Sequence, residues 1–184
     1  MQLLFIINAL KIIFILGFLV LIHETGHFII ARLCKVRVKE FAIGFGPTIW
    51  KKRGKETKYA LRLIPLGGFV SMEGEEERSN KEGSFSNSSI PKRIAIVAAG
   101  GLVNIIFALI VYQILITVLT GDFTKALSST GSFAFSIVDS LKMLFSGGVS
   151  VDQLMGPVGI SSVVAQTSNL AEFVYILAVI SMSL

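Results

Sequence analysis

Residues 12–30 read IIFILGFLVLIHETGHFII, a run of nineteen residues whose only ionisable side chains are His23, Glu24 and His27. At about 1.5 Å per residue, an α-helix of this length spans roughly 28 Å, close to a bilayer core of about 30 Å. The run therefore predicts a transmembrane helix. Ionisable groups are costly inside a bilayer unless they are paired or bind a metal ion, so these three indicate a functional site.

The three ionisable residues form the pattern H-E-x-x-H. Residues at positions i and i+4 lie on one face of a helix, so the imidazoles of His23 and His27 can bind one Zn²⁺ at about 2.0–2.1 Å. Glu24 then lies beside the first ligand, where it can take a proton from water and pass it to a leaving amine. Gly26 places no side chain over the metal, which would allow a substrate backbone to approach. The chain has no other histidine.

The sequence shows no evident third metal ligand. The remaining candidate carboxylates are Asp122, Asp139 and Asp152, which follow the second apolar segment. They are expected on the far side of the membrane from His23 and are better explained as solvated or turn residues. We expect the third ligand beyond Leu184 or on a partner chain.

Composition supports a membrane protein, because 53% of the residues are hydrophobic and only 16% are charged. A second segment, residues 94–119, carries no charge, and a third, residues 173–184, reads as the start of another helix. Fourteen of the 17 Lys and Arg residues lie in 32–93. The positive-inside rule places this loop in the cytoplasm, and the basic charge needs no nucleic acid to explain it.

The loop changes from a helical to a strand pattern. Residues 35–39 alternate between basic and apolar side chains, and residues 48–51 and 58–63 flank a hairpin turn at 53–55. Residues 65–70 end one strand or start another, and residues 73–91 read as a flexible loop. We expect a small sheet against the membrane, with these side chains facing the lipid: Phe41, Ile43, Phe45 and Trp50.

The C-terminal third is divided by composition. Residues 121–132 read as a Ser/Thr/Gly linker, and residues 133–145 have the apolar spacing of an interfacial amphipathic helix. The predicted regions are therefore 1–120, 121–132 and 133–184. The predicted fold class is a mainly α, polytopic membrane protein with two full transmembrane helices, the start of a third, and a small membrane-associated β-sheet in the cytoplasmic loop.

Five patches, in order, resemble the site-2 proteases, the intramembrane zinc metalloproteases, of the bacterial RseP-like branch. They are residues 18–27, 44–47, 65–70, 99–104 and 156–160. The resemblance implies that His23 and His27 bind zinc and that Glu24 is the catalytic acid and base. It implies cleavage of single-pass membrane proteins, of the anti-sigma-factor or remnant-signal-peptide class, in the bacterial inner membrane.

The resemblance also assigns roles around the metal. The strands of residues 41–70, including Gly67 and Gly68, would help to present an extended substrate. Asn104 resembles a polar residue of the second span that faces the site, although a helix–helix hydrogen bond explains it equally well.

Three features depart from the family. Ala99-Gly100-Gly101 stands where the family usually has Ala-Gly-Pro. The family's third zinc ligand is the Asp of a Leu-Asp-Gly motif, and the chain ends before any such motif. Members usually carry one or two PDZ domains where residues 121–132 stand, so the chain is either a variant without that domain or a fragment with a deletion.

Other functions compete with proteolysis. A membrane scaffold or regulator could keep the histidine pair for structure or metal storage, and a zinc site could exist without hydrolysis. A metal transporter would need more intramembrane carboxylates or histidines than the spans contain. A zinc protease with a water-exposed site would place H-E-x-x-H outside the apolar run.

Overall fold

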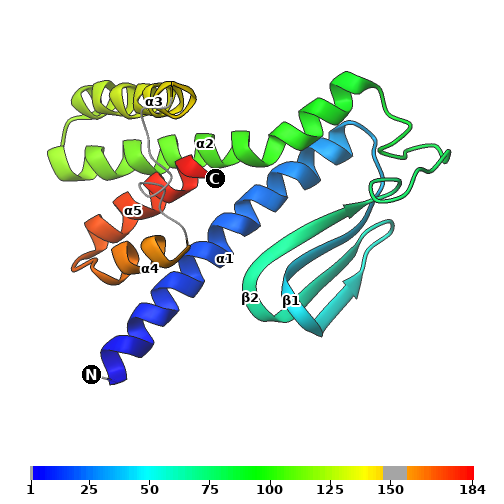
Figure 1. Ribbon diagram of the computed structural model, residues 1–184, viewed down its shortest axis with the longest axis horizontal. Coiled ribbons are helices and arrows are strands. Elements are labelled where there is room, and N and C mark those ends of the chain that lie inside the picture. Colours follow the sequence, from blue (N-terminus) through cyan, green and yellow to red (C-terminus); the bar gives the residue numbers. More distant parts are fainter. Residues whose placement is uncertain (1, 147–156) are drawn as a thin grey trace. The chain divides into compact units, whose positions relative to one another are not determined.

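The computed structural model describes residues 2–146 and 157–184 (Figure 1). The chain divides into two compact units, which we call the central unit (Ile13–Asn104) and the flanking unit (residues up to 12 together with Ile105–Leu184). The elements follow in the order α1 (Gln2–Leu33), β1 (Val38–Arg53), β2 (Lys58–Met72), α2 (Ile90–Thr120), α3 (Phe123–Phe145), α4 (Pro157–Ala165) and α5 (Leu170–Ser183).

Helices α1 and α2 are long and apolar enough to cross a membrane, as the sequence predicts. Both are longer than the predicted segments, because α1 begins at Gln2 and α2 begins at Ile90. Lys11 lies inside α1. Its ammonium donates to the Thr167 carbonyl (2.9 Å), which satisfies the charge within the flanking unit.

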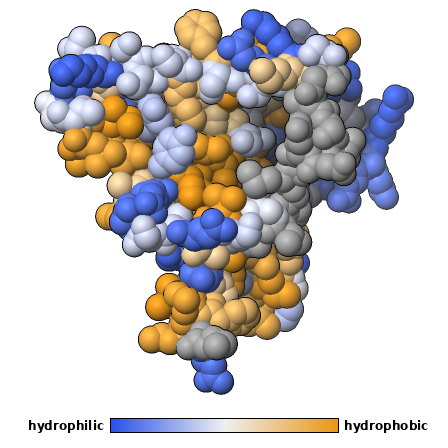
Figure 2. Space-filling model, turned by 60° about the vertical axis from the view of Figure 1, so that its left-hand side comes forward, coloured by the Kyte–Doolittle hydropathy of each residue, from blue (hydrophilic) through white to orange (hydrophobic). Residues whose placement is uncertain are grey.

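Large apolar side chains remain exposed along both long helices. On α2 they recur about every four residues, which gives one exposed apolar stripe on the helix. Figure 2 shows hydrophobic residues at the surface on the face in view. Such a surface suits contact with lipid better than contact with water. The stripe consists of Ile94, Val97, Leu102, Ile106, Ile110, Ile114 and Val118.

β1 and β2 form an antiparallel hairpin, as the loop sequence predicts, and each strand is bent. Ala42 pairs with both Phe69 and Ala60, and residues 40–43 each have a partner on both sides. Positive φ angles at Gly44 (84°) and Gly67 (92°) allow the bends. In the described part of the chain, residues 68–72 pair on one side only and form an outer edge of the sheet.

The hairpin packs against α1 through a buried apolar cluster. A Cβ on Gly17 would lie only 2.5 Å from the Pro65 carbonyl oxygen, so glycine lets the backbones approach. Phe41 packs edge-on against Phe28 of α1, with ring centroids 5.3 Å apart. Its predicted lipid-facing position is therefore wrong. The cluster contains Ala31, Val36, Val38, Val70, Met72 and Ile96.

The other predicted lipid-facing residues differ in how far their side chains are exposed. Phe45 and Trp50 are half exposed, at 50% and 53%, and their contact with lipid stays a prediction. Ile43 is partly buried, because it lies in the part of β1 that pairs on both sides.

Residues 73–89 form turns and irregular structure tied to the core. Phe85 packs against the buried cluster, and its N–H donates to the Glu73 carbonyl (2.7 Å). Pro91, which was expected in this loop, lies in the first turn of α2, where a missing N–H costs nothing.

The flanking unit corrects the predicted linker at 121–132. Only Gly121 and Asp122 lie outside the helices, because α3 begins at Phe123. Asp122 caps α3 by accepting the N–H groups of Thr124 (2.9 Å) and Lys125 (3.0 Å). The hydroxyls of Thr130 and Ser132 bond to carbonyls four residues earlier, so a Ser/Thr-rich sequence continues as helix.

The C-terminal segments agree with the sequence in part. α3 contains the predicted amphipathic helix of residues 133–145, and Tyr112 of α2 stacks on its Phe133 (centroids 4.3 Å apart). α5 matches the predicted third apolar segment, with an N-cap at Asn169. The short helix α4 was not predicted. Asp152 and Gly156 lie outside the described residues.

Candidate active site

His23 and His27 lie one turn apart on α1, and α2 holds both rings. The ring centroids are 4.9 Å apart and the ring planes meet at 74°. Nδ1 of His27 lies 2.7 Å from the Ile96 carbonyl oxygen of α2. A carbonyl only accepts, so Nδ1–H donates, and the lone pair of the neutral ring is then on Nε2.

Asn104 holds the second ring. It is fully buried, and its side-chain Nδ2 lies 3.2 Å from Nδ1 of His23. As placed, the amide N–H donates to Nδ1; binding of a metal through Nε2 requires the amide turned by 180°, so that Oδ1 accepts from Nδ1–H. Such partners fix the orientation of metal-binding histidines. The structure therefore brings Asn104 to the site, as the resemblance implies.

Gly100 lies where the two Nε2 atoms converge. A Cβ on Gly100 would overlap the Nε2 atoms of both His23 and His27. Ile96, Gly100 and Asn104 are spaced four apart on α2 and therefore share one face of that helix. On this face, the Ile96 carbonyl and the Asn104 amide contact the two rings, and Gly100 leaves the position between them open.

Gly26 serves a different purpose from the predicted one. A Cβ there would lie 2.6 Å from the Ala99 carbonyl oxygen and 3.0 Å from the Val103 side chain. Gly26 is buried and allows α1 and α2 to approach closely. The idea that it opens space for a substrate is therefore wrong.

Glu24 faces the hairpin. It lines a cavity of about 340 Å³ together with Phe69, Val70 and Met72 of β2. A Cβ on Gly68 would lie 3.6 Å from Cγ of Glu24. The carboxylate therefore lies beside the outer edge of the sheet. The remaining lining residues come from α1, the loop and α2: His27, Glu75, Phe85, Ile96 and Val97.

The two predicted substrate-binding glycines differ in their surroundings. Gly68 pairs with Ile43 and lies next to Glu24. Gly67 has a φ of 92°, and a Cβ on it would overlap the Phe45 ring. The local backbone explains Gly67 without a substrate, and its predicted role remains a prediction.

The donor set fits zinc in part. Two imidazoles whose Nε2 atoms converge are ligands that Zn²⁺ prefers, and a zinc site needs at least one more protein ligand. Among the described residues, no group of three or more His, Cys, Asp or Glu side chains could hold a metal ion. Asp122 caps α3 and Asp139 pairs with Lys142, both within the flanking unit.

Sequence reasoning missed two parts of the site. The Ile96 carbonyl is a backbone group, so its residue type gives no signal. Gly100 was noted only as part of a changed family patch. Its spacing of four from Asn104, within a charge-free segment, is the signal that could have found it.

Comparison with known proteins agrees with this geometry. The family model of peptidase family M50 matches residues 11–184. A Clostridium acetobutylicum protein, whose name assigns it provisionally to the zinc metalloproteases, is 45% identical over 107 residues, covering 58% of this chain and 32% of its own. The regulator of sigma-E protease RseP of Escherichia coli is 42% identical over 113 residues, covering 59% and 25%.

The matched relatives are much longer than the aligned region. The chain covers about a quarter to a third of their length. The family match nevertheless extends over all but the first ten residues, including the H-E-x-x-H helix, the hairpin and the glycine–asparagine face of α2. This chain belongs to peptidase family M50, the family of site-2 metalloproteases.

Proposed function

We propose that the protein containing this chain is an intramembrane zinc metalloprotease that cleaves transmembrane segments of single-pass membrane proteins. The convergence of the His23 and His27 Nε2 atoms on Gly100, with Glu24 one residue from the first ring, carries the proposal. We infer that the third zinc ligand comes from a region beyond Leu184.

Zinc would supply a Lewis acid, and it would lower the pKa of a bound water to about 7. His23 and His27 would hold it through Nε2. The Glu24 carboxylate would take the proton of the attacking water and return it to the nitrogen of the leaving amine. Glu24 is the one carboxylate of α1, so this role has no other candidate on that helix.

The outer edge of the hairpin, residues 68–72, would present the substrate. A helical substrate hides its carbonyls in internal hydrogen bonds and must unwind before cleavage. Unpaired backbone groups on an edge strand can bind the unwound segment by β-augmentation. Because Gly68 lies beside Glu24, a strand added at this edge would pass next to the catalytic carboxylate.

We place the protein in the bacterial inner membrane, with α1 and α2 as membrane spans and residues 32–93 in the cytoplasm. The positive-inside rule and the exposed apolar stripe of α2 support this arrangement. The name of the Escherichia coli relative connects it to sigma-E regulation, which supports an anti-sigma factor as the substrate class; remnant signal peptides are the alternative.

The direct test is Glu24→Gln in the zinc-loaded protein that includes the region beyond Leu184. The amide cannot move a proton, so cleavage of a single-pass substrate in liposomes should fall about 10²–10⁴-fold. Zinc content should be unchanged, because the histidines keep their partners. Glu76→Gln, an exposed loop carboxylate, serves as the control and should cleave normally.

The same measurement separates proteolysis from a scaffold role. If the Glu24→Gln protein cleaves as fast as wild type, Glu24 is not the catalytic base. If the folded wild-type protein holds no zinc, the scaffold explanation replaces the protease.

A further inference from the structure

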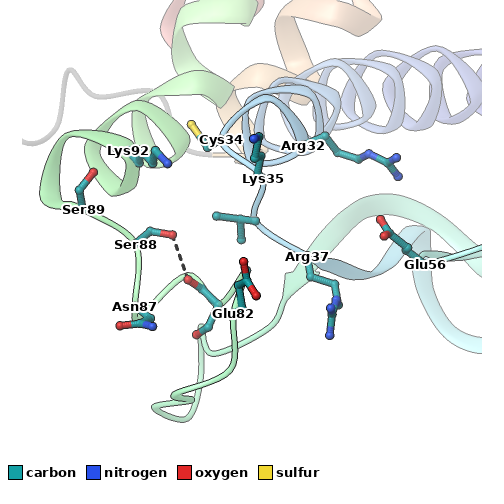
Figure 3. Close-up of a pocket in the computed structure, with 13 residues that line it drawn as sticks. Arg32, Cys34, Lys35, Arg37, Glu56, Glu82, Asn87, Ser88, Ser89 and Lys92 are labelled. Atoms are coloured by element: carbon teal, nitrogen blue, oxygen red, sulfur yellow. Dashed lines mark hydrogen bonds between the residues drawn. The ribbon is translucent and has the colours of Figure 1, made fainter.

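A second cavity lies in the central unit, where α1 ends and α2 begins. It has a volume of about 650 Å³, within the range of small-molecule sites. Figure 3 shows its lining side chains, which come from the end of α1, the segment before β1, the turn between β1 and β2, the loop before α2 and the first turn of α2. Glu24 and both histidines are not among them, so this cavity is separate from the active site.

The cavity is rich in unpaired positive charge. Four basic side chains line it, against the two carboxylates Glu56 and Glu82. Within residues 2–146 and 157–184, none of the four lies within 4.0 Å of a carboxylate oxygen, whereas Lys58 and Arg62 on the hairpin both pair with Glu40. The four basic residues are Arg32, Lys35, Arg37 and Lys92.

Lys35 occupies a backbone position that favours glycine. It lies two positions after the last residue of α1 and has a φ of 61°, the one positive φ outside glycine in the described residues. The N–H of Val36 donates to the Ala31 carbonyl (2.8 Å), the hydrogen bond of a Schellman cap, in which glycine is the usual residue. A lysine at this position gives up backbone stability and places a cation at the cavity, which points to a ligand.

The wall of the cavity is held by hydrogen bonds. The N–H of Arg37 donates to the Gly83 carbonyl (2.8 Å), and the Ser88 hydroxyl donates to the Ser84 carbonyl (2.9 Å). α2 begins beside the cavity with no acidic residue in its first turn. The N-terminus of this helix therefore adds to the positive potential.

We propose that this cavity binds the phosphate of an anionic lipid headgroup. Arg32 lies in the last turn of α1 and Lys92 in the first turn of α2, the two membrane-capable helices. With α1 and α2 as the membrane spans proposed above, the cavity would lie at the level of the lipid phosphates. Basic pockets at helix ends attract anionic lipids. The two carboxylates can accept hydrogen bonds from headgroup hydroxyls, as in a glycerol headgroup. This inference does not depend on zinc or on proteolysis.

The test counts lipid bound to the purified chain in an uncharged detergent by native mass spectrometry, during titration with short-chain phosphatidylglycerol. Wild type should retain one lipid. Lys35→Gly should weaken retention about fivefold while its unfolding temperature stays equal or rises, because glycine suits the backbone. Lys35→Arg keeps the charge and should retain the lipid. Lys52→Ala removes an exposed cation elsewhere and is the matched control.

Three results would overturn the proposal. Equal retention of phosphatidylglycerol by wild type and Lys35→Gly would show that the cations serve membrane orientation alone. Equal retention of phosphatidylcholine would remove the requirement for an anionic headgroup. Displacement of the lipid by an equal concentration of inorganic phosphate would assign the cavity to a soluble anion.

Discussion

The central and flanking units use their polar side chains in opposite ways. In the central unit, side-chain hydrogen bonds join residues far apart in sequence, such as His27 to Ile96 and Asn104 to His23. In the flanking unit, hydroxyls mostly return to their own helix, as Thr117 does to the Gln113 carbonyl and Thr130 to the Ala126 carbonyl. Lys11, which reaches Thr167, and Gln113, which reaches the Phe123 carbonyl (3.4 Å), are exceptions among the described residues.

The difference distinguishes side chains that position another element from side chains that only satisfy their own hydrogen bonds. A hydroxyl that donates to a carbonyl of its own helix has its hydrogen bond satisfied in lipid or in water. It holds no neighbouring element in place. A side chain that bonds across the fold fixes the two elements that it joins. Substitution of the central-unit residues that contact the histidines should therefore alter the metal site, and matched substitutions in the flanking unit should alter only local stability.

Gly100→Ala is expected to have the largest effect. The added Cβ would overlap the Nε2 atoms of His23 and His27, so both rings must move. Zinc affinity, measured by competition with a chromogenic chelator, should fall about a hundredfold. The matched variant is Gly131→Ala in α3, where a Cβ meets nothing within 4 Å. It should leave zinc affinity unchanged and raise the unfolding free energy by about 0.5–1 kcal/mol.

If Gly100→Ala binds zinc as tightly as wild type, the expected difference between the central and flanking units does not hold at the metal site. This result would mean that the rings do not converge on Gly100 when metal is bound.

Asn104→Ala is expected to have the next largest effect. It removes the partner of His23 Nδ1, and loss of such a partner lowers zinc affinity by about 10–100-fold. Thr130→Ala is the matched change, because Thr130 is also buried and bonds only to its own helix. It should leave zinc affinity unchanged. If both variants bind zinc like wild type, Asn104 serves helix packing alone, the alternative left open by the sequence.

The sequence predicts the parts of the fold that follow from local patterns. H-E-x-x-H fixes two rings on one face of α1, and apolar length predicts α1 and α2. The hairpin follows from alternation around a turn. The sequence cannot show that β1 bends at Gly44 and pairs on both sides, because pairing depends on tertiary contacts. It also misassigns residues 123–132, since Ser and Thr satisfy themselves in a helix as readily as in a linker.

Site residues follow the same division. His23, Glu24 and His27 are identified because charge inside an apolar run is costly. Gly100 and Lys35 are not, because their meaning depends on what a side chain would meet or on a backbone angle.

The smallest expected effect concerns the ion pairs of the two units. Glu40 accepts from Lys58 (3.1 Å) and Arg62 (3.0 Å), which are 18 and 22 positions away. Burial would raise the pKa of Glu40, but these two hydrogen bonds outweigh it and hold the pKa below its ordinary 4.5. The stabilisation is therefore complete above pH 4.5 and is lost as the pH falls through the lowered value of the folded protein.

Glu40→Gln should therefore lower the unfolding free energy by about 1 kcal/mol at pH 7, and the difference from wild type should vanish in acid. The matched change is Asp139→Asn in α3, whose pair with Lys142 is exposed and only three positions long. It should have no measurable effect at either pH. Thermal unfolding in detergent at pH 7 and pH 3.5 measures both. If the two variants lose equal unfolding free energy at pH 7, the long-range ion pairs of Glu40 stabilise the protein no more than the local surface pair of Asp139 and Lys142.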